Sequence, residues 1–232
     1  MPDGLGVPDQ GSWVEGWLSQ TRFRSYLDKA DGDQARALVL YEWNSALSCA
    51  VLHDLGHFEV ALRNAYATAF DRTWQGSQHW LDDPSSPLRA RLYRKRKRRT
   101  GRQFVDVNDK LRRAIDDARR KHGVEAAPGK IIAELSFGQW RYLSSASREK
   151  TLWVPHLHHA FPSGTSRAEV DAKIGDLHTL RNRAAHWEPL LEEPVADRLS
   201  GLLWVAGLLS PNLASYIQRH SQIPALLNNR PS

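Results

Sequence analysis

Sulfur is nearly absent from this sequence, whose 232 residues include one cysteine, Cys49, and one methionine. A single cysteine cannot form a disulfide within the chain, and it also excludes a zinc site built from several cysteine thiolates. Cys49 lies within an apolar helical pattern and has no partner. The sequence therefore predicts a reduced, cytoplasmic protein without a disulfide framework.

Long apolar segments are also missing. The longest uninterrupted apolar run covers residues 202–209, far short of the roughly 20 residues that a transmembrane helix needs. Residues 1–11 are rich in glycine, proline and aspartate and lack a basic segment followed by an apolar one, so no secretory signal is visible. We expect a loose tail at 1–11 and no membrane partner.

Alternating apolar and polar segments bounded by hairpin turns, the pattern of β-sheets, do not appear. Apolar residues instead recur at the spacing of helices. The prediction is an all-α fold in a single domain covering 1–232, with its core at about 20–210 and one long central helix. The expected helices are two short ones within 13–27, one long or two collinear ones over 33–74, and others over 106–122, 128–143, 166–186, 194–209 and from 211 onward.

The net charge of +6 is concentrated in residues 89–102, while the rest of the chain is close to balanced. A dense cationic run is typical of phosphate binding, and RNA is the partner that we expect for it. A solvated loop or helix face and nuclear targeting are the alternative interpretations. Tyr93 and Phe104 flank the run, and the sequence favours packing in the core over stacking on bases for both residues. The basic residues are Arg89, Arg91, Arg94, Lys95, Arg96, Lys97, Arg98, Arg99 and Arg102.

Residues 177–189 combine an apolar helical pattern with a strong base, an amide and an imidazole, namely Arg181, Asn182 and His186. Pro189 limits the helix, because it lacks an N–H and clashes with the preceding turn. Asn182 and His186 are four residues apart and share a helix face, whereas Arg181 and His186 are about 140° apart at about 100° per residue. Arg181 reaches the imidazole only through its long side chain, by local unwinding, or across a dimer axis.

These residue types suit the cleavage of RNA without a metal ion. A neutral imidazole can take the proton from a ribose 2′-OH, which then attacks the adjacent phosphate. Guanidinium groups stabilise the charge that develops on the phosphoryl oxygens, and Asn182 would orient the imidazole or hold the phosphate. The alternative is structural, with His186 capping the C-terminus of a helix and Arg181 a solvated charge.

The sequence contains two further groups of polar residues that could belong to a site. Glu59, Arg63 and Asn64 lie in the long helical segment, where they form either a surface ion pair or the support of a site built by another helix. Three histidines lie together in 155–164, where a metal site would need an acidic or cysteine partner that is not close in sequence. We expect a loop cluster there, with no metal and no cofactor. The three histidines are His156, His158 and His159.

Four segments together resemble the Abi-like (abortive infection) family of bacterial proteins, within the HEPN superfamily. The run 177–186 is similar to the family pattern Leu-x-x-Leu-Arg-Asn-x-x-Ala-His, and 41–44, 58–64 and 134–140 are similar to three other family segments in order and spacing. The resemblance covers about 20–210. Residues 187–190 depart from it, since many relatives continue with another histidine and a basic tail where this chain has Trp-Glu-Pro-Leu.

The resemblance implies an α-helical bundle, usually dimeric, in which the Arg-x4-6-His motifs of two protomers meet in a shared cleft. It also implies a metal-independent endoribonuclease that acts as a toxin or in phage defence, controlled by an antitoxin, a regulatory RNA or a phage trigger. Some HEPN domains bind nucleic acid or protein without cutting, which leaves a non-catalytic RNA-binding module open. By position, Arg181 and His186 would be catalytic, Asn182 would support them, and Glu59, Arg63 and Asn64 match a further family segment.

Overall fold

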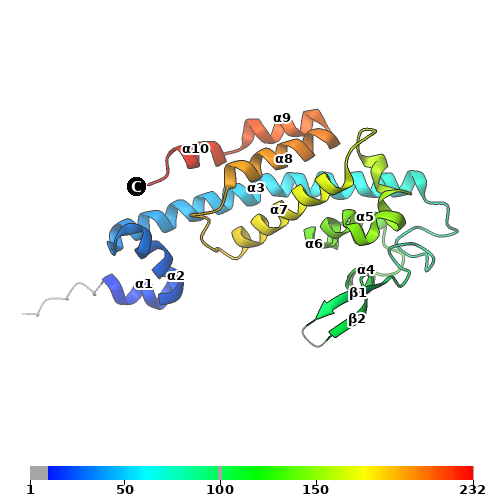
Figure 1. Ribbon diagram of the computed structural model, residues 1–232, viewed down its shortest axis with the longest axis horizontal. Coiled ribbons are helices and arrows are strands. Elements are labelled where there is room, and N and C mark those ends of the chain that lie inside the picture. The colour runs from blue at the N-terminus through cyan, green and yellow to red at the C-terminus, as the bar shows by residue number, and fades with distance from the viewer. Residues whose placement is uncertain (1–9, 99–100, 232) are drawn as a thin grey trace, which may run out of the picture.

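In the computed structural model, which describes residues 10–98 and 101–231, the chain is helical apart from one two-stranded sheet (Figure 1). The predicted all-α class is confirmed. The α-helices are α1 (Gln10–Leu18), α2 (Gln20–Leu27), α3 (Gln34–Thr73), α4 (Asp109–His122), α5 (Pro128–Glu134), α6 (Phe137–Arg141), α7 (Arg167–Ala185), α8 (Val195–Leu209), α9 (Pro211–His220) and α10 (Ile223–Asn228). The strands are β1 (Tyr93–Arg98) and β2 (Gly101–Asp106). No helix in these described ranges is long and apolar enough to cross a membrane.

Short turns of the 3₁₀ or π type supplement these elements. They are η1 (Asp28–Ala30), η2 (Tyr142–Ser144), η3 (Ala146–Arg148), the π turn η4 (Glu149–Trp153) and η5 (Leu157–Ala160). Four of them, η2 to η5, form the segment between α6 and α7. The last of these, η5, lies inside the predicted loop at 155–164.

α3 is the axis of the molecule, because it runs for 40 residues without a break, a length of about 60 Å at 1.5 Å per residue. Its N-cap is Asp33, whose carboxylate accepts hydrogen bonds from the Ala35 and Arg36 N–H groups at 2.9 and 3.0 Å. Of the two predicted possibilities the structure has the single long helix, and Gly56 lies within it. A glycine costs a helix interior about 1 kcal/mol, which the buried side chains on either side of Gly56 outweigh.

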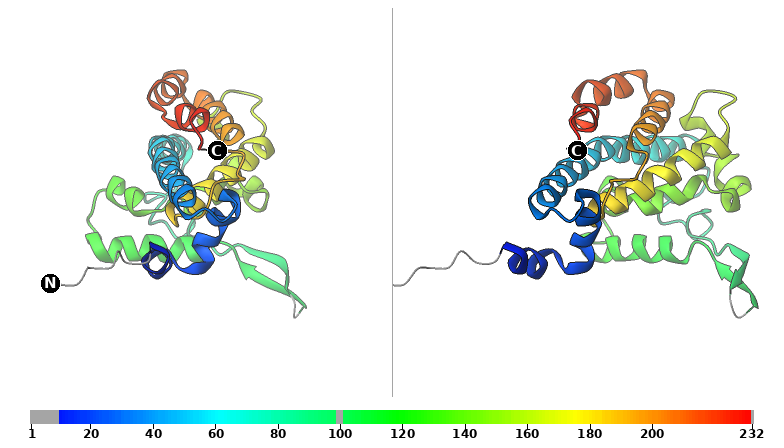
Figure 2. Two further views of the ribbon diagram at one scale, coloured as in Figure 1. Left: turned by 90° about the vertical axis from the view of Figure 1, so that its left-hand side faces the viewer. Right: turned by 60° about the vertical axis from the view of Figure 1, so that its left-hand side comes forward.

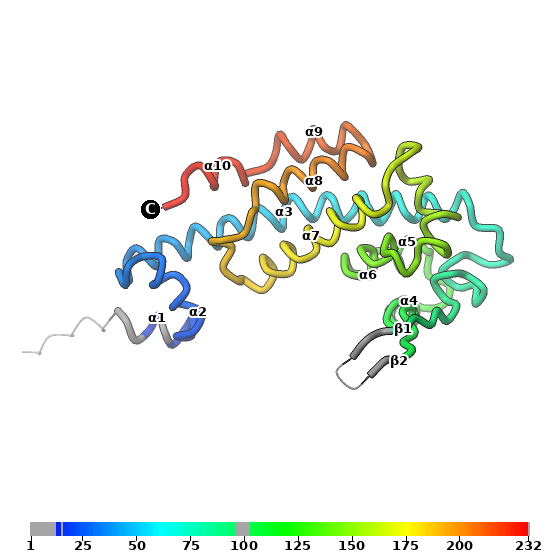
Figure 3. Tube along the Cα trace, viewed as in Figure 1, coloured from blue at the N-terminus to red at the C-terminus, as the bar shows by residue number. Residues whose placement is uncertain are grey.

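Helices from both ends of the chain cover α3. α7 and α8 run along it, and α9 packs on α8 (Figures 1, 2 and 3). α2 and α10 pack near its N-terminal end, where the Trp43 indole N–H donates to the Leu226 carbonyl at 2.7 Å. The core reaches beyond the predicted limits of about 20–210, since Val14 and Ile223 are buried in it.

A β-hairpin occupies the basic segment, where the sequence predicted only a loop or a helix face. β1 and β2 are antiparallel and pair Tyr93 with Asp106 and Lys95 with Phe104. The hairpin projects from the helical body (Figures 1 and 2). The sequence did not predict these strands, because cationic residues occupy successive positions of β1. The alternation of apolar and polar residues that identifies a strand is therefore missing.

Asp106 holds the base of the hairpin. Its carboxylate accepts hydrogen bonds from the Leu92 and Asn108 N–H groups, both at 3.0 Å, and pairs with Arg112 at 2.7 Å. Burial by itself would raise the pKa of this carboxyl group, but the hydrogen bonds from Arg112 and from the two N–H groups hold the pKa below its ordinary value. The hairpin therefore joins the body through an ionised, well-paired carboxylate.

Asn44, a buried residue of α3, holds the segment that follows α7. Its Oδ1 accepts a hydrogen bond from the Leu190 N–H at 2.7 Å, and its Nδ2 donates to the Glu188 carbonyl at 3.5 Å. Arg183 of α7 holds the same segment by donating to the Pro189 carbonyl at 2.9 Å. The path of the chain after the Arg-Asn-x3-His segment is thus fixed from two helices.

Replacing Asn44 with leucine tests this clamp. The Leu190 N–H would be left buried without an acceptor, which costs about 1–3 kcal/mol. We expect the free energy of unfolding, measured by urea denaturation, to fall by about that amount. Glu42→Ala, on an exposed face of the same helix, should change it by less than about 0.5 kcal/mol. An unchanged stability for Asn44→Leu would show that the clamp contributes nothing.

Asp106→Asn tests the anchor of the hairpin. Because folding lowers the pKa of Asp106, its contribution is present above the unfolded pKa of about 3.9 and is lost as the pH falls through the folded value. The hairpin amides should lose protection from hydrogen exchange in that acidic window. In Asp106→Asn the lower protection should be present already at pH 7, whereas Asp117→Asn, in an exposed ion pair of α4, should leave it unchanged. Equal protection in Asp106→Asn and the wild type at pH 7 would contradict the anchoring role.

Candidate active site

The Arg-Asn-x3-His segment lies at the end of α7, and a left-handed residue terminates this helix before Pro189 is reached. The helix ends at Ala185, with His186 in the C-cap position. Trp187 has a φ of 55°, and the N–H groups of Trp187 and Glu188 donate to carbonyls of the last helical turn at 3.1 and 2.9 Å. This is a Schellman motif, in which glycine usually takes the left-handed position. A bulky residue there stores backbone strain directly after His186.

His186 has an exposed side chain and a firmly held backbone. Its N–H donates to the Asn182 carbonyl at 3.0 Å, and its carbonyl accepts a hydrogen bond from Arg22 of α2 at 3.3 Å. Within the described residues, no hydrogen bond or ion pair joins the side chains of His186 and Arg181. The C-cap position agrees with the alternative in which His186 only caps the helix. The imidazole is exposed, so a catalytic role for His186 also stays a prediction.

Three segments that are far apart in sequence meet beside α7. Glu59 and Arg63 come from α3, and Arg181 of α7 lies close enough to act electrostatically on Glu59. The backbone of Phe137, at the start of α6, lies close enough to lower the pKa of the Glu59 carboxyl group, and the Phe137 ring lies 5.8 Å from the ring of His178 of α7. We call the residues Glu59, Arg63, His178, Arg181 and Asn182 the polar cluster. The sequence segments 58–64, 134–140 and 177–186 thus come together in space.

Glu59 is the half-buried carboxylate of the polar cluster. Burial raises the pKa of its carboxyl group above the ordinary value, while the positive charges of Arg181 and Arg63 and the Phe137 N–H oppose this rise. The two interpretations of Glu59 and Arg63 were a surface ion pair and support for a site built by another helix. The approach of Arg181 from α7 favours the second.

Arg63 and Arg181 are half-buried, and neither makes a hydrogen bond or ion pair with another described residue. The Nε of Arg63 is fully buried without a hydrogen-bond partner among those residues. Other half-buried arginines of this region have carboxylate partners. Arg141 lies 3.1 Å from Asp171, Arg183 lies 3.0 Å from Glu193, and Arg198 pairs with Asp176. A guanidinium group withdrawn from water without a partner is costly, so the two arginines offer donors to an anion.

His178 is the member of the polar cluster that the sequence prediction missed. Its Nε2 lies 3.3 Å from the Asn182 Nδ2, so the amide expected to orient His186 is directed to His178. Burial lowers the pKa of His178, as do the charges of Arg141 and Arg181, which keeps the imidazole neutral at neutral pH. The spacing of four residues between His178 and Asn182 is the pattern that could have identified it.

α6 reaches α7 closely because of a glycine. A Cβ atom on Gly138 would lie 3.2 Å from the His178 Nε2, tighter than ordinary van der Waals contact. The phenyl rings of Phe58 and Phe137 meet edge to face at 6.1 Å and join α3 to α6 beneath the cluster. Asn64, by contrast, is exposed on α3 and does not join the polar cluster through any hydrogen bond of the described residues.

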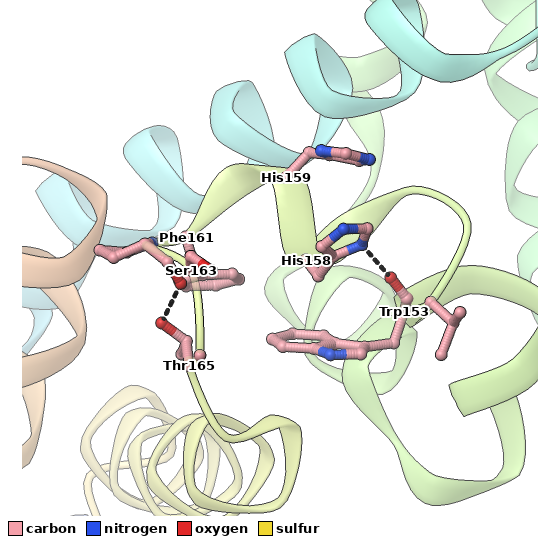
Figure 4. Close-up of a pocket in the computed structure, with 9 residues that line it drawn as sticks. Trp153, His158, His159, Phe161, Ser163 and Thr165 are labelled. Carbon is pink, nitrogen blue, oxygen red and sulfur yellow. Dashed lines mark hydrogen bonds between the residues drawn. The ribbon is translucent and has the colours of Figure 1, made fainter.

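The three histidines of the segment 155–164 do not converge on one point. His156 is buried, and its Nδ1 lies 2.7 Å from the Thr73 Oγ1. His158 is exposed, its Nδ1 lies 3.1 Å from the Trp153 carbonyl, and its ring lies 3.8 Å from that of His159 (Figure 4). In residues 10–98 and 101–231, no group of three or more histidine, cysteine or acidic side chains could hold a metal ion.

His158 and His159 instead line an open cavity of about 510 Å³ (Figure 4). Trp153 and Phe161 form its apolar side with rings stacked at 5.3 Å, and residues 162–165 form its rim. No residue of the polar cluster lines this cavity, which is therefore separate from the candidate active site.

The basic run is described only in part. Arg91 and Lys95 are exposed, whereas both Nε and Nη2 of Arg94 donate to the Ser147 carbonyl, at 3.2 and 3.0 Å. Arg94 is thus occupied within the protein. Arg99 lies outside the described residues, and so do the side chains of four other predicted RNA-binding residues, Arg96, Lys97, Arg98 and Arg102.

Comparison of the chain with models of protein families, with curated proteins and with solved structures finds no match.

Proposed function

We propose that the protein is a bacterial, cytoplasmic endoribonuclease that cuts RNA without a metal ion, with the polar cluster and His186 as its active site. The observation that carries the proposal is the pair of half-buried arginines, Arg63 and Arg181, whose charges act on Glu59 and which make no hydrogen bond or ion pair with another described residue. Two guanidinium groups in a partly desolvated site suit a phosphodiester. The resemblance to the Abi-like family supports a role as a toxin or in phage defence, restrained by an antitoxin, a regulatory RNA or a phage trigger.

The proposed reaction is an internal transesterification. The His186 imidazole takes the proton of a ribose 2′-OH, and the 2′-oxygen attacks phosphorus while the bond to the 5′-oxygen breaks. The leaving 5′-oxygen takes a proton from water and the imidazolium returns its proton to the solvent, so the products carry a 2′,3′-cyclic phosphate and a 5′-OH. Arg181 and Arg63 stabilise the charge on the phosphoryl oxygens. Because the nucleophile belongs to the ribose, RNA is cut and DNA is not.

A second copy of the chain completes the site in this proposal. Arg181 lies beside α3, where it acts on Glu59, whereas His186 lies five residues further on with its side chain in solvent. This separation favours a homodimer in which Arg181 of one protomer and His186 of the other act on the same phosphate. The neutral His178 and Asn182 position the substrate beside them.

Cleavage of an RNA pool in EDTA is the first test. Purified protein should cut the pool and leave 2′,3′-cyclic phosphate and 5′-OH ends. His186→Ala should slow cleavage about 10²- to 10⁴-fold and Arg181→Ala about 10²- to 10³-fold. Arg219→Ala and His220→Ala, both exposed on α9, should keep the wild-type rate. The proposal fails if the wild type cuts no RNA in the pool, or if it cuts at the rate of His186→Ala.

Mixing two inactive variants tests the composite site. When Arg181→Ala and His186→Ala are unfolded and refolded together, half of the dimers are mixed, and each has one site with both residues intact. Activity should return to about a quarter of the wild-type value. Each variant refolded alone should stay inactive. A mixture without activity would assign both residues to the same protomer's site.

A non-catalytic RNA-binding module is the second candidate, and the projecting basic hairpin favours it. In that case RNA binding should weaken steeply with salt and on neutralising the basic residues of 95–99, with the structural Arg94 left in place. Binding should be the same in His186→Ala, and the wild type should cut nothing. Measured cleavage that depends on His186 would reject this candidate.

A further inference from the structure

The register of the hairpin places aromatic and cationic side chains on one face. Paired residues of an antiparallel ribbon share a face, and so do residues two apart along a strand. Tyr93 and Lys95 of β1 are therefore on the same face as Phe104 of β2, which pairs with Lys95. The Lys95 Nζ lies 5.6 Å from the centre of the Phe104 ring. We call Tyr93, Lys95 and Phe104 the aromatic face of the hairpin.

Contacts with the helical body decide which face of the hairpin is free. Arg94 and its pairing partner Val105 lie on the opposite face, and both are half-buried. The two hydrogen bonds from Arg94 to the Ser147 carbonyl attach that face to the body. Asp106, which pairs with Tyr93, is held by Arg112 at the base of the hairpin, whereas the side chains of Tyr93, Lys95 and Phe104 are exposed to solvent.

Both rings of the aromatic face are strongly exposed, Tyr93 by 52% and Phe104 by 67%. The sequence favoured core packing for these residues, and the structure shows that this expectation is wrong. An exposed phenylalanine gains nothing from burial on folding. Lys95 stands beside it as a cation, in the most basic segment of the chain. Exposed rings interleaved with cations suit bases and phosphates in alternation.

We propose that the aromatic face binds single-stranded RNA, with bases stacked on Phe104 and Tyr93 and a phosphate beside Lys95. A duplex would leave Phe104 without a partner, because its bases are stacked on one another and only their edges are open. In single strands the bases can turn out and stack on protein rings. The choice of RNA as the ligand rests on the proposed function, whereas the stacking contact does not depend on cleavage.

Binding should be measured by fluorescence anisotropy with a labelled 12-nucleotide single-stranded RNA and with the same strand in a duplex, in the His186→Ala background to prevent cutting. The single strand should bind more tightly. Phe104→Ala and Tyr93→Ala should each weaken its binding about 5- to 150-fold, while Phe104→Trp should retain it. Lys95→Gln should weaken binding and reduce its salt dependence.

Matched controls are Val154→Ala and Lys150→Gln, since both side chains are exposed outside the hairpin, and both should bind like the parent. Tighter binding of the duplex, or binding indifferent to Phe104→Ala, would overturn the inference. So would capture of an acidic protein on this face in place of RNA. If stacking is observed but the wild type cuts nothing, the proposed function fails and this inference stands. If RNA is cut while Phe104→Ala binds it normally, this inference fails and the proposed function stands.

Discussion

A helix of 40 residues cannot cover its own apolar surface, and this constraint organises the whole molecule. Buried residues of α3 occur in adjacent pairs along its length, so that they cannot all lie on one narrow stripe; examples are Trp43 with Asn44 and Leu47 with Ser48. Partners are therefore needed on more than one side. They come from α2 and α10 near one end and from α7 and α8 along the helix. The candidate active site lies where α3, α6 and α7 meet.

Much of the fold could be predicted because its helices have clear ends. Asp33 and Ser166 both act as side-chain N-caps, a role that aspartate and serine favour. Gly123 closes α4 with a positive φ of 88°, which glycine adopts without strain. The hairpin could not be predicted, because its strands are held by pairing and by anchors such as Arg94 to Ser147. Such contacts leave no apolar period in the sequence.

The candidate site was predictable in its parts and not in its assembly. Arg181, His186 and Glu59 were selected for residue type and spacing, and the structure brings Arg181 to Glu59. The contact between His178 and Asn182 follows from their spacing on α7, whereas the approach of α6 to His178 depends on helix packing and on the small size of Gly138. That Arg63 has no partner in the described part of the chain is likewise a property of the packed helices, since any carboxylate at a suitable distance could have paired with it.

The order of the polar cluster along the chain has a consequence for biosynthesis. Glu59 and Arg63 are translated early, whereas Arg181 follows only after the hairpin, α4, α5 and α6 have been made. Contacts between such distant segments form slowly, because a long loop must close first. A chain still attached to the ribosome therefore holds an incomplete cluster until α7 has emerged and docked on α3. Whatever chemistry the cluster performs, it is withheld during most of the protein's own translation.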